Sequence, residues 1–534
     1  MKQNMVRCTT GATTRREALK RLGSFGLISF APALLSGCGS DDIDRVLPSG
    51  YRSLSVDAGS AASTIRSLQG VNGPPVPAFL GAANVPPNAG PSSLNANPVL
   101  NPRGLDLTAV YQKMGVDFVR THDLDADGTG DIDGDGINRI FPDWNADPLN
   151  PASYNFAPAD RIIAGIIQAG ERVSFNFGRS DLSMVGLHNS AVPPDDFNKY
   201  AAIAKQVVLH YNEGWANGFN YEIQYWEIWN ESDLLPFWSG TAGQYYSLYE
   251  SVATAIKSVS PNLKVGGPAM GSNNPALGLQ GTFLQFVKDN NLPLDFYSFH
   301  YYANGSDPLD FSTLTNQYRT LLDQYGFTGT ELHLNEWGNA LFLNPQPSPE
   351  TLAAFVTTAM TYLQDAPLDH ACLYYRSGGN LIQDDGSLTQ AGYAFSAIGS
   401  VSGMSRLAAT GQDQSGFSVL AGSSNNTSEI RVVIANYQIP AADMIPLPGG
   451  NVVTVPGVST FEYLPRRQIT YANNQGYQLV VRNLPSGKSF TVNRYRIDAG
   501  HQLTLVDTSQ GNGPELVITA ALAPPSVELI VING

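Results

Sequence analysis

Cysteine and basic side chains are both scarce in this chain of 534 residues, and each shortage argues against a class of protein. Three cysteines cannot build the disulfide framework that holds small secreted domains together. The 31 lysine and arginine residues stand against 46 acidic ones, which gives a net charge of −15. A nucleic-acid-binding protein neutralises phosphates with clustered basic side chains, so this balance argues against nucleic acid as a partner.

Long apolar runs are also missing after the first forty residues, and no later segment is apolar enough to cross a membrane. Hydrophobic residues still make up 43% of the chain, which is enough to bury a sizeable core. At about 150 residues per domain, the length predicts two or more domains, or one large barrel with an appendage. Aromatic residues are plentiful, with 24 Tyr and 23 Phe, and an acidic, aromatic surface suits a neutral ligand rich in hydroxyl groups.

The first 37 residues have the features of an export signal. Arg15 and Arg16 precede an apolar run, Phe25 to Leu35, that is too short to span a bilayer. The paired arginines resemble a twin-arginine signal, and Leu35-Ser36-Gly37-Cys38 resembles a bacterial lipobox. We therefore predict an export signal over 1–37, a lipidated Cys38 and a tether over 38–50. The alternative is an ordinary secretory signal that is cut elsewhere.

This prediction places the protein outside the cytoplasm, as a periplasmic or cell-surface lipoprotein that touches the membrane only through a lipid at Cys38. Residues 1–37 carry six basic side chains and one acidic one, so their removal takes the net charge from −15 to −20. Cys8 leaves with the signal, and Cys372 remains as the single free thiol of the mature chain. The mature protein then has no disulfide bond.

Between residues 70 and 400 short apolar strands alternate with amphipathic helices. The predicted strands are Val76–Gly81, Asp117–His122, Arg172–Phe177, Tyr221–Trp229, Leu263–Pro268, Asp295–His300, Glu331–Asn335 and His370–Tyr375. Most are dense in Val, Ile, Phe and Tyr, as parallel strands covered on both faces are. Eight such alternations predict an α/β fold, a (β/α)₈ TIM barrel over residues 70–400.

From residue 401 to 534 the pattern changes to short strands separated by turns. The predicted strands are Phe417–Ala421, Glu429–Tyr437, Thr460–Tyr463, Tyr477–Asn483, Phe490–Ile497, His501–Asp507, Glu515–Ala521 and Val527–Ile532. This spacing predicts a β-sandwich accessory domain after the barrel. A strand within residues 51–69 precedes the barrel, and we expect it to join the same sandwich.

Two glutamates stand where predicted barrel strands end, which is where barrel enzymes carry their chemistry. Glu231 follows the fourth predicted strand and Glu336 follows the seventh. Strict alternation along the fourth strand puts Glu227 and Glu231 on one face and turns Asn230 away from it. Strands four and seven lie three apart in a ring of eight, so both carboxylates can face one bond. Glycoside hydrolysis with retention needs such a pair, about 5–5.5 Å apart.

The segments around these glutamates resemble a known family. Trp229-Asn230-Glu231 and Asn335-Glu336-Trp337 look like the signature of clan A retaining glycosidases. Further segments resemble glycoside hydrolase family 39, which holds β-xylosidases and α-L-iduronidases: Gly70-Val71-Asn72-Gly73-Pro74, Phe118-Val119-Arg120-Thr121-His122-Asp123, Val265-Gly266-Gly267-Pro268-Ala269 and Phe299-His300-Tyr301-Tyr302. The resemblance covers roughly residues 51–400.

The resemblance implies a role for each matching residue. Glu231 would be the acid/base and Glu336 the nucleophile. Asn230 would bind the sugar 2-hydroxyl, and the subsite beside the nucleophile would be shaped by Arg120, His122, His300 and Tyr302. Trp337 and Tyr375, at the ends of predicted strands seven and eight, are further candidate substrate contacts.

An acidic segment follows the second predicted strand. Asp123, Asp125 and Asp127 alternate as the first ligands of a calcium loop do, but Gly134 stands where the closing glutamate belongs. The segment is therefore either a structural calcium site or a solvated acidic loop. His188, His210 and His333 stand in no metal-ligand spacing, which argues against a catalytic zinc site.

These observations predict a retaining glycoside hydrolase that needs no cofactor and acts on an oligo- or polysaccharide. The expected substrate is a plant cell-wall or other neutral glycan, with β-xylosidase-like or arabinoside-releasing action. Two alternatives are a non-catalytic glycan-binding surface lipoprotein and an endo-acting exopolysaccharide hydrolase.

Overall fold

The structure is a computed structural model and describes most of the chain after residue 46. The described ranges are 47–76, 105–121, 137–178, 192–272, 279–339, 347–374, 380–383, 385–424, 428–457, 459–472 and 474–534. The predicted export signal, Cys38 and the acidic segment 123–136 lie outside them. Among the helices of the described ranges, none has both the length and the apolar character that crossing a bilayer requires.

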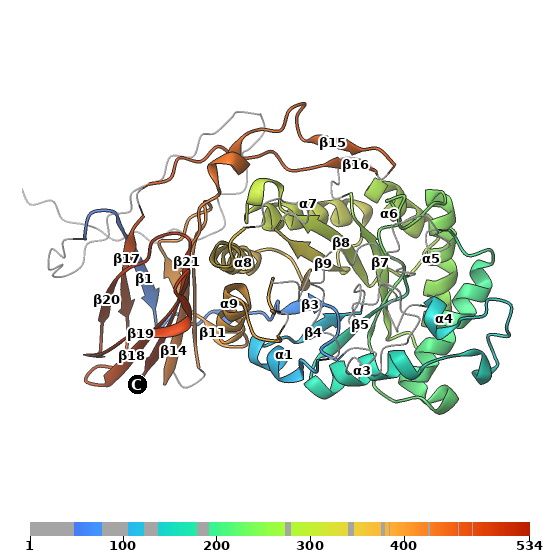
Figure 1. The fold of residues 1–534 in the computed structure, drawn as a ribbon, viewed down its shortest axis with the longest axis horizontal. Coiled ribbons are helices and arrows are strands. Elements are labelled where there is room, and N and C mark those ends of the chain that lie inside the picture. The colour runs from blue at the N-terminus through green and yellow to red at the C-terminus, as the bar shows by residue number, and fades with distance from the viewer. Residues whose placement is uncertain are drawn as a thin grey trace, which may run out of the picture. The chain divides into compact units, whose positions relative to one another are not determined.

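Eight parallel strands close into a barrel in the order β10-β3-β4-β5-β6-β7-β8-β9 (Figure 1). Their bounds are β3 Gly70–Asn72, β4 Phe118–Arg120, β5 Arg172–Asn176, β6 Tyr225–Glu227, β7 Lys264–Met270, β8 Phe296–Tyr302, β9 Glu331–Gly338 and β10 His370–Leu373. The predicted (β/α)₈ barrel is confirmed. The first predicted strand is wrong, because Gly70–Asn72 pairs with β4 and β10 in place of Val76–Gly81.

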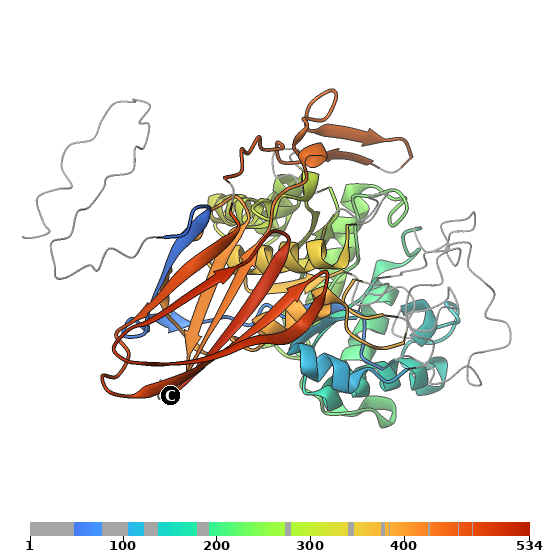
Figure 2. The ribbon, with the colours of Figure 1, turned by 60° about the vertical axis from the view of Figure 1, so that its left-hand side comes forward.

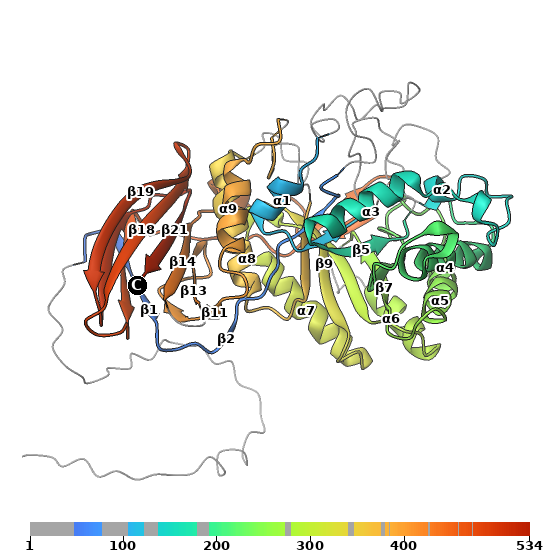
Figure 3. The same ribbon diagram turned by 90° about the horizontal axis from the view of Figure 1, so that it is seen from below.

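Helices surround the barrel, as Figure 3 shows from below. They are α1 Thr108–Met114, α2 Ile137–Ile140, α3 Ala157–Ala169, α4 Phe197–Glu213, α5 Ala242–Lys257, α6 Leu279–Asp289, α7 Asp310–Tyr325, α8 Pro349–Leu363 and α9 Gln390–Gly399. Their starts follow from local chemistry, since the Asp196 side chain caps α4 and Thr241 forms a capping box with Gln244 at the start of α5. Each long helix turns an apolar stripe toward the strands, which fixes the barrel from outside.

The barrel interior is filled by rings at the amino ends of its strands. Phe118, Tyr225 and Phe296 are buried together with Cys372 in one cluster. The His370 ring stacks on Phe118 with centroids 4.0 Å apart. This packed floor closes one end of the barrel and leaves the carboxyl ends of the strands for chemistry.

A β-sandwich of two sheets follows the barrel, as predicted. One sheet has the order β12-β1-β17-β20 and the other the order β19-β18-β21-β14-β13-β11-β2. Their bounds are β1 Tyr51–Asp57, β2 Ser63–Thr64, β11 Ser405–Arg406, β12 Ala408–Thr410, β13 Phe417–Ser423, β14 Glu429–Asn436, β17 Gly476–Arg482, β18 Ser489–Asp498, β19 His501–Asn512, β20 Leu516–Ala521 and β21 Ser526–Asn533. The strand β1 lies parallel to β17, and Figure 2 shows it in blue among the red and orange strands. The two sheets enclose an apolar core of their own.

One strand predicted for the sandwich lies elsewhere. Thr460–Tyr463 corresponds to β16, Ser459–Glu462, which pairs only with β15, Val452–Val455, among the described strands. The two form a separate hairpin because their side chains stay exposed or half-buried and complete no apolar face.

The barrel and the sandwich are joined through polar contacts near the carboxyl end of β8. Arg467 forms an ion pair with Asp307, which is itself buried. The Tyr437 hydroxyl donates to the Ser306 backbone oxygen at 2.8 Å. The sandwich therefore buttresses the segment that follows β8, a strand that carries two of the candidate site residues.

Candidate active site

The two candidate glutamates meet at the carboxyl ends of the barrel strands. Glu231 lies four residues beyond β6, and Glu336 lies in β9. One carboxylate oxygen of each, together with a ring nitrogen of His300, lie within 4.8 Å of one another. This separation suits a double-displacement mechanism, in which the two carboxyl groups stand about 5–5.5 Å apart.

The backbone between Glu227 and Glu231 does not continue as a strand. Trp229 has φ of 71° and Glu231 has φ of 43°, in the left-handed region that side chains rarely adopt. The backbone N–H of Glu231 donates to the Ala269 oxygen at 3.0 Å, which holds this turn against β7. Strict alternation was therefore the wrong expectation here, because the turn points Asn230 into the site as well. Such local strain concentrates at functional sites.

Arg120 lies at the base of the site and is fully buried. Its Nη1 donates to Glu336 Oε1 at 2.8 Å and its Nε donates to Glu227 Oε2 at 2.7 Å. Its Nη2 donates to Asn230 Oδ1 at 2.8 Å. One guanidinium thus links three groups from β9 and from the carboxyl end of β6, with a fixed fork geometry that a lysine could not reproduce.

The second oxygen of Glu336 faces two residues of β8. The Tyr302 hydroxyl donates to Oε2 at 3.0 Å, and His300 Nδ1 lies 3.3 Å from it. Burial raises the pKa of Glu336 above the ordinary glutamate value, while His300, Arg120 and the Tyr302 hydrogen bond act in the opposite direction. These contacts favour the ionised carboxylate that a nucleophile requires.

Glu231 has a different environment, with His300 Nδ1 2.8 Å from its Oε1. Burial and the nearby charge of Asp233 raise the pKa of Glu231 to about 8. Burial also lowers the pKa of His300 to about 4, so this imidazole is neutral at neutral pH. Two carboxyl groups in different environments, one without a cationic partner within hydrogen-bond distance among the described residues and one paired with Arg120, are the pattern of an acid and a nucleophile sharing one site.

Only the oxygen of the Asn230 side-chain amide has a hydrogen-bond partner among the described residues. Its Oδ1 must face Arg120, because a guanidinium has no acceptor, and its Nδ2 then points away. Among the described residues this buried Nδ2 finds no hydrogen-bond partner. The same holds for Nε2 of His300. Two buried polar atoms without partners beside a carboxylate pair suit a polar ligand, because such atoms are costly to leave unpaired.

Glu227 lies beneath the site and not at its mouth. Its carboxylate accepts from Arg120, from Asn176 Nδ2 at 2.6 Å and from Asn335. These donors hold the pKa of Glu227 below its ordinary value although burial opposes them. An ionised, fully paired carboxylate of this kind orients its neighbours.

Two asparagines support the site although the sequence did not single them out for it. Asn72 in β3 accepts from Arg120 Nη1 at 3.2 Å, and Asn176 in β5 donates to both Glu227 and the Trp229 oxygen. Both are inward-facing polar residues at the carboxyl ends of barrel strands. That position was the signal that could have found them.

The prediction that Trp337 contacts the substrate is wrong. Its ring is fully buried and packs edge-on against Phe311 of α7, with centroids 5.1 Å apart. The pairing of β8 with β9 shifts register between Phe299 and His300, so that Glu336 turns inward and Trp337 turns out toward the helices. A ring in this position offers no face to a sugar. The other predicted contacts His122 and Tyr375, and the calcium candidates Asp123, Asp125 and Asp127, lie outside the described residues.

A cavity of about 200 Å³ opens at Ser232 and Asp233, the two residues that follow Glu231 in the chain. It is lined mainly by aromatic and apolar side chains, with one carboxylate: Ser232, Asp233, Leu235, Trp238, Gly240, Ala242, Tyr245, Tyr246 and Met270. Asp233 is held in place because it accepts from the backbone N–H groups of Gly271 and Ser272, at 3.0 and 2.8 Å. The cavity is therefore lined by the segment that follows Glu231, the residue suited to protonate a leaving group.

The fold and the carboxylate pair define a barrel of the kind that retaining glycosidases use. The sequence model of Glycosyl hydrolases family 39 matches residues 103–376, and the chain belongs to this family.

Curated relatives and solved structures agree with this assignment. A beta-xylosidase of Geobacillus stearothermophilus is 28% identical over 283 residues, which is 48% of this chain and 53% of the relative. A beta-xylosidase of Caldicellulosiruptor saccharolyticus is 29% identical over 31% of this chain and 34% of the relative. The matched part thus spans about half the length of the first and a third of the second.

Among solved structures, a glucosidase from Croceicoccus marinus superposes with a TM-score of 0.76 at 30% identity, covering 91% of this chain and 99% of that one. A GH39 enzyme from Xanthomonas axonopodis pv. citri superposes with a TM-score of 0.61 at 15% identity, over 92% and 99%. The second likeness shows a shared fold.

Proposed function

We propose that the protein is a retaining glycoside hydrolase. Glu231 donates its proton to the glycosidic oxygen while Glu336 attacks the anomeric carbon, so the carbon–oxygen bond to the leaving group breaks as a glycosyl–Glu336 ester forms. Glu231, now ionised, takes a proton from water, and the water oxygen displaces Glu336. The sugar leaves with its original configuration, and no cofactor takes part in either step.

The observation that carries this proposal is the pairing of Glu231 and Glu336 in unequal environments. Their oxygens lie within 4.8 Å, Glu231 has a raised pKa of about 8, and Glu336 accepts from Arg120 and Tyr302. Burial and the charge of Asp233 thus favour the protonated form of Glu231, whereas the contacts of Glu336 with Arg120 and Tyr302 favour its ionised form. A non-catalytic glycan-binding protein has no need of this difference.

The proposed substrate is a neutral glycoside with a free 2-hydroxyl group, of the xyloside or glucoside type. The curated relatives are named as β-xylosidases and the structural relative at 30% identity as a glucosidase. Asn230 Nδ2, which has no hydrogen-bond partner among the described residues, is the donor available for a 2-hydroxyl group. The aromatic cavity at Ser232 and Asp233 has room for the leaving group.

Removal of the nucleophile tests the proposal. The Glu336→Ala variant should lose turnover of an activated aryl glycoside, and added azide should restore it with a glycosyl azide of inverted configuration as product. Glu250→Ala, which removes an exposed glutamate of α5, serves as the matched control and should keep wild-type turnover. Undiminished hydrolysis by Glu336→Ala, or rescue with retention, would contradict the mechanism.

We further propose that the protein is exported and anchored by a lipid on Cys38. The support is the order of Arg15-Arg16, the short apolar run and Leu35-Ser36-Gly37-Cys38. A free thiol at Cys372 that is fully buried in the barrel suits a protein that is exported after folding, since it requires no oxidative pairing.

A further inference from the structure

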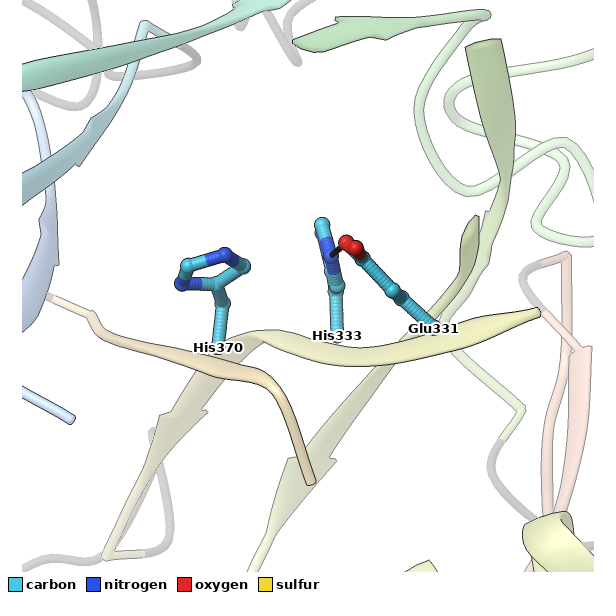
Figure 4. A group of neighbouring side chains, drawn as sticks. All are labelled: Glu331, His333 and His370. Carbon is cyan, nitrogen blue, oxygen red and sulfur yellow. Dashed lines mark hydrogen bonds and ion pairs between the residues drawn. The ribbon is translucent and has the colours of Figure 1, made fainter. Parts of the chain in front are cut away.

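A second cluster of ligand-type side chains lies at the opposite end of the barrel from the carboxylate pair. Glu331 and His333 belong to the start of β9, and His370 is the first residue of β10. His333 and His370 are direct neighbours across this parallel strand pair. Figure 4 shows the three side chains rising side by side from the two strands toward one space.

The distances within this floor cluster of Glu331, His333 and His370 are close to those of a metal site. His333 Nε2 lies 3.2 Å from Glu331 Oε2, and one donor atom from each residue lies within 4.8 Å of the other two. Donors around a tetrahedral zinc ion stand about 3.3 Å apart, given bonds of about 2.0–2.1 Å. One pair is thus already at that spacing, and His370 needs to approach by no more than about 1.5 Å.

The residue types of the floor cluster match the donors that zinc prefers. His333 and His370 offer ring nitrogens, and both side chains are buried. Glu331 offers a carboxylate oxygen that already lies 3.2 Å from His333 Nε2. Two imidazoles and a carboxylate are a donor set that suits zinc and similar divalent transition metals.

The Lys264 ammonium group would compete with a metal ion for the Glu331 carboxylate. Lys264 in β7 forms an ion pair with Glu331 Oε1 and donates to the Tyr225 hydroxyl at 3.1 Å. His370 Nε2 lies 3.3 Å from that same hydroxyl. A metal ion on Oε2 leaves Oε1 to Lys264, whose half-buried side chain can also turn toward solvent. The competition predicts that removal of the lysine charge tightens metal binding.

We propose that Glu331, His333 and His370 form a divalent transition-metal site of the zinc type that clamps β9 to β10 at the floor of the barrel. The site is structural. Glu336 lies five positions after Glu331 along β9, about 16 Å at about 3.3 Å per position, so the ion takes no part in bond cleavage. The sequence spacing of the three residues gave no sign of the cluster, because closure of the barrel brings His370 beside His333.

Zinc titration of the full-length, chelator-treated protein tests this site, with calorimetry for binding and thermal melting for stability. One equivalent should bind and raise the melting temperature, because a ligand that binds only the folded state stabilises it. Glu331→Gln and His370→Phe should each weaken binding by about tenfold or more, and Lys264→Met should strengthen it. His501→Gln is the matched control, since it removes a surface histidine paired with Asp498 at 2.8 Å and should leave binding unchanged.

Glu231, His300 and Glu336 are the other group of three that could hold an ion among the described residues, so the experiment must separate the two. Binding at the floor should persist in the Glu231→Gln/Glu336→Gln double variant, and zinc at one equivalent should leave glycosidase turnover of the wild type unchanged. The proposal is overturned if no zinc binds, if Glu331→Gln and His370→Phe both bind like the wild type, or if the double variant abolishes binding. Glu331→Gln alters a half-buried side chain and keeps a hydrogen-bond acceptor for His333, so we expect this variant to fold. Its zinc affinity therefore tests the proposed site even if His370→Phe does not fold.

Discussion

Arg120 and Glu336 form an ion pair away from solvent, with Nη1 2.8 Å from Oε1. The same guanidinium pairs with Glu227 at 2.7 Å, so one positive charge lies between two carboxylates. A buried pair of this kind adds little net stability, because desolvation offsets most of the attraction. Its value lies in chemistry, since it keeps the Glu336 carboxylate ionised inside an apolar barrel.

Loss of the Arg120 charge should therefore move the acid limb of the pH–rate profile. In Arg120→Lys the ammonium cannot reach Glu336, Glu227 and Asn230 together, and the pKa of Glu336 should rise. We expect kcat/KM to fall by about 100-fold or more and the acid limb to shift to higher pH. Steady-state rates from pH 4 to 9 measure both effects. Arg172→Lys, which changes a half-exposed arginine of β5, is the control and should leave the pH–rate profile unchanged. An acid limb that does not move in Arg120→Lys would refute the role of Arg120 in keeping Glu336 ionised.

Glu231 should set the opposite limb. The acid must be protonated to act, and the pKa of Glu231 is raised to about 8, so activity should decline as pH rises through about 8. In Glu231→Gln the side chain cannot ionise, and this basic limb should disappear. The variant should lose about 10²–10⁴-fold with poor leaving groups, and far less with a dinitrophenyl leaving group that needs no proton in the first step. A basic limb that persists in Glu231→Gln would assign it to another group.

Asn230 should be responsible for recognition of the 2-hydroxyl group. Its Nδ2 is a donor that no residue in the described part of the chain uses, and the rate loss caused by Asn230→Ala should depend on whether the substrate has that hydroxyl. We expect a loss of about 10–100-fold with the normal glycoside and a small loss with its 2-deoxy analogue. The four rate constants form a double-mutant cycle, and Asn290→Ala, at the exposed residue that follows α6, is the control. Equal losses with both substrates would indicate a purely structural asparagine.

The sequence predicted the barrel and the proximity of Glu231 and Glu336 because both depend on local patterns. Alternating apolar strands and amphipathic helices define the barrel, and a glutamate at a strand end is visible without any contact information. The directions of the Asn230 and Trp337 side chains could not be predicted in this way. The left-handed turn at Trp229 and the register shift before Glu336 each reverse the face on which the next side chain lies. Such irregularities come from packing between strands, which period-two alternation does not contain.

Non-local pairing explains the remaining differences. The strand Gly70–Asn72 has three residues and is defined only by its partners in β4 and β10, so the longer apolar segment after it was the stronger pattern. The sequence of β16 has the pattern of a sandwich strand, and only the exposed and half-buried side chains of the β15–β16 hairpin show that it lies outside the sandwich. His333 and His370 likewise meet only because the last two barrel strands are neighbours.

The cavity at Ser232 and Asp233 should select the leaving group. Leu235 lines it and is 54% exposed, so Leu235→Ala removes apolar surface without opening the protein core. We expect kcat/KM to fall by about 3–10-fold for a bulky aromatic leaving group and to change little for a methyl glycoside. Leu149→Ala, at a leucine that is 66% exposed, should affect neither substrate. Equal loss with both substrates would show that Leu235 acts on the catalytic groups and not on the leaving group.

The proposed anchor makes a prediction that is independent of catalysis. Wild-type protein made in a bacterium with lipoprotein processing should partition into the detergent phase and carry a fatty-acyl group at Cys38, because a lipid adds about 0.8 kcal/mol of membrane affinity per buried CH₂ group. Cys38→Ser should remain unlipidated and accumulate as a soluble or uncleaved species with unchanged turnover per molecule. Cys372→Ser, at the buried thiol of β10, should still be lipidated.

Replacement of Arg15 and Arg16 together by lysine should block export of the folded chain. Mass spectrometry of the mature N-terminus decides between this prediction and an ordinary secretory signal, which would leave an unmodified N-terminus at another residue.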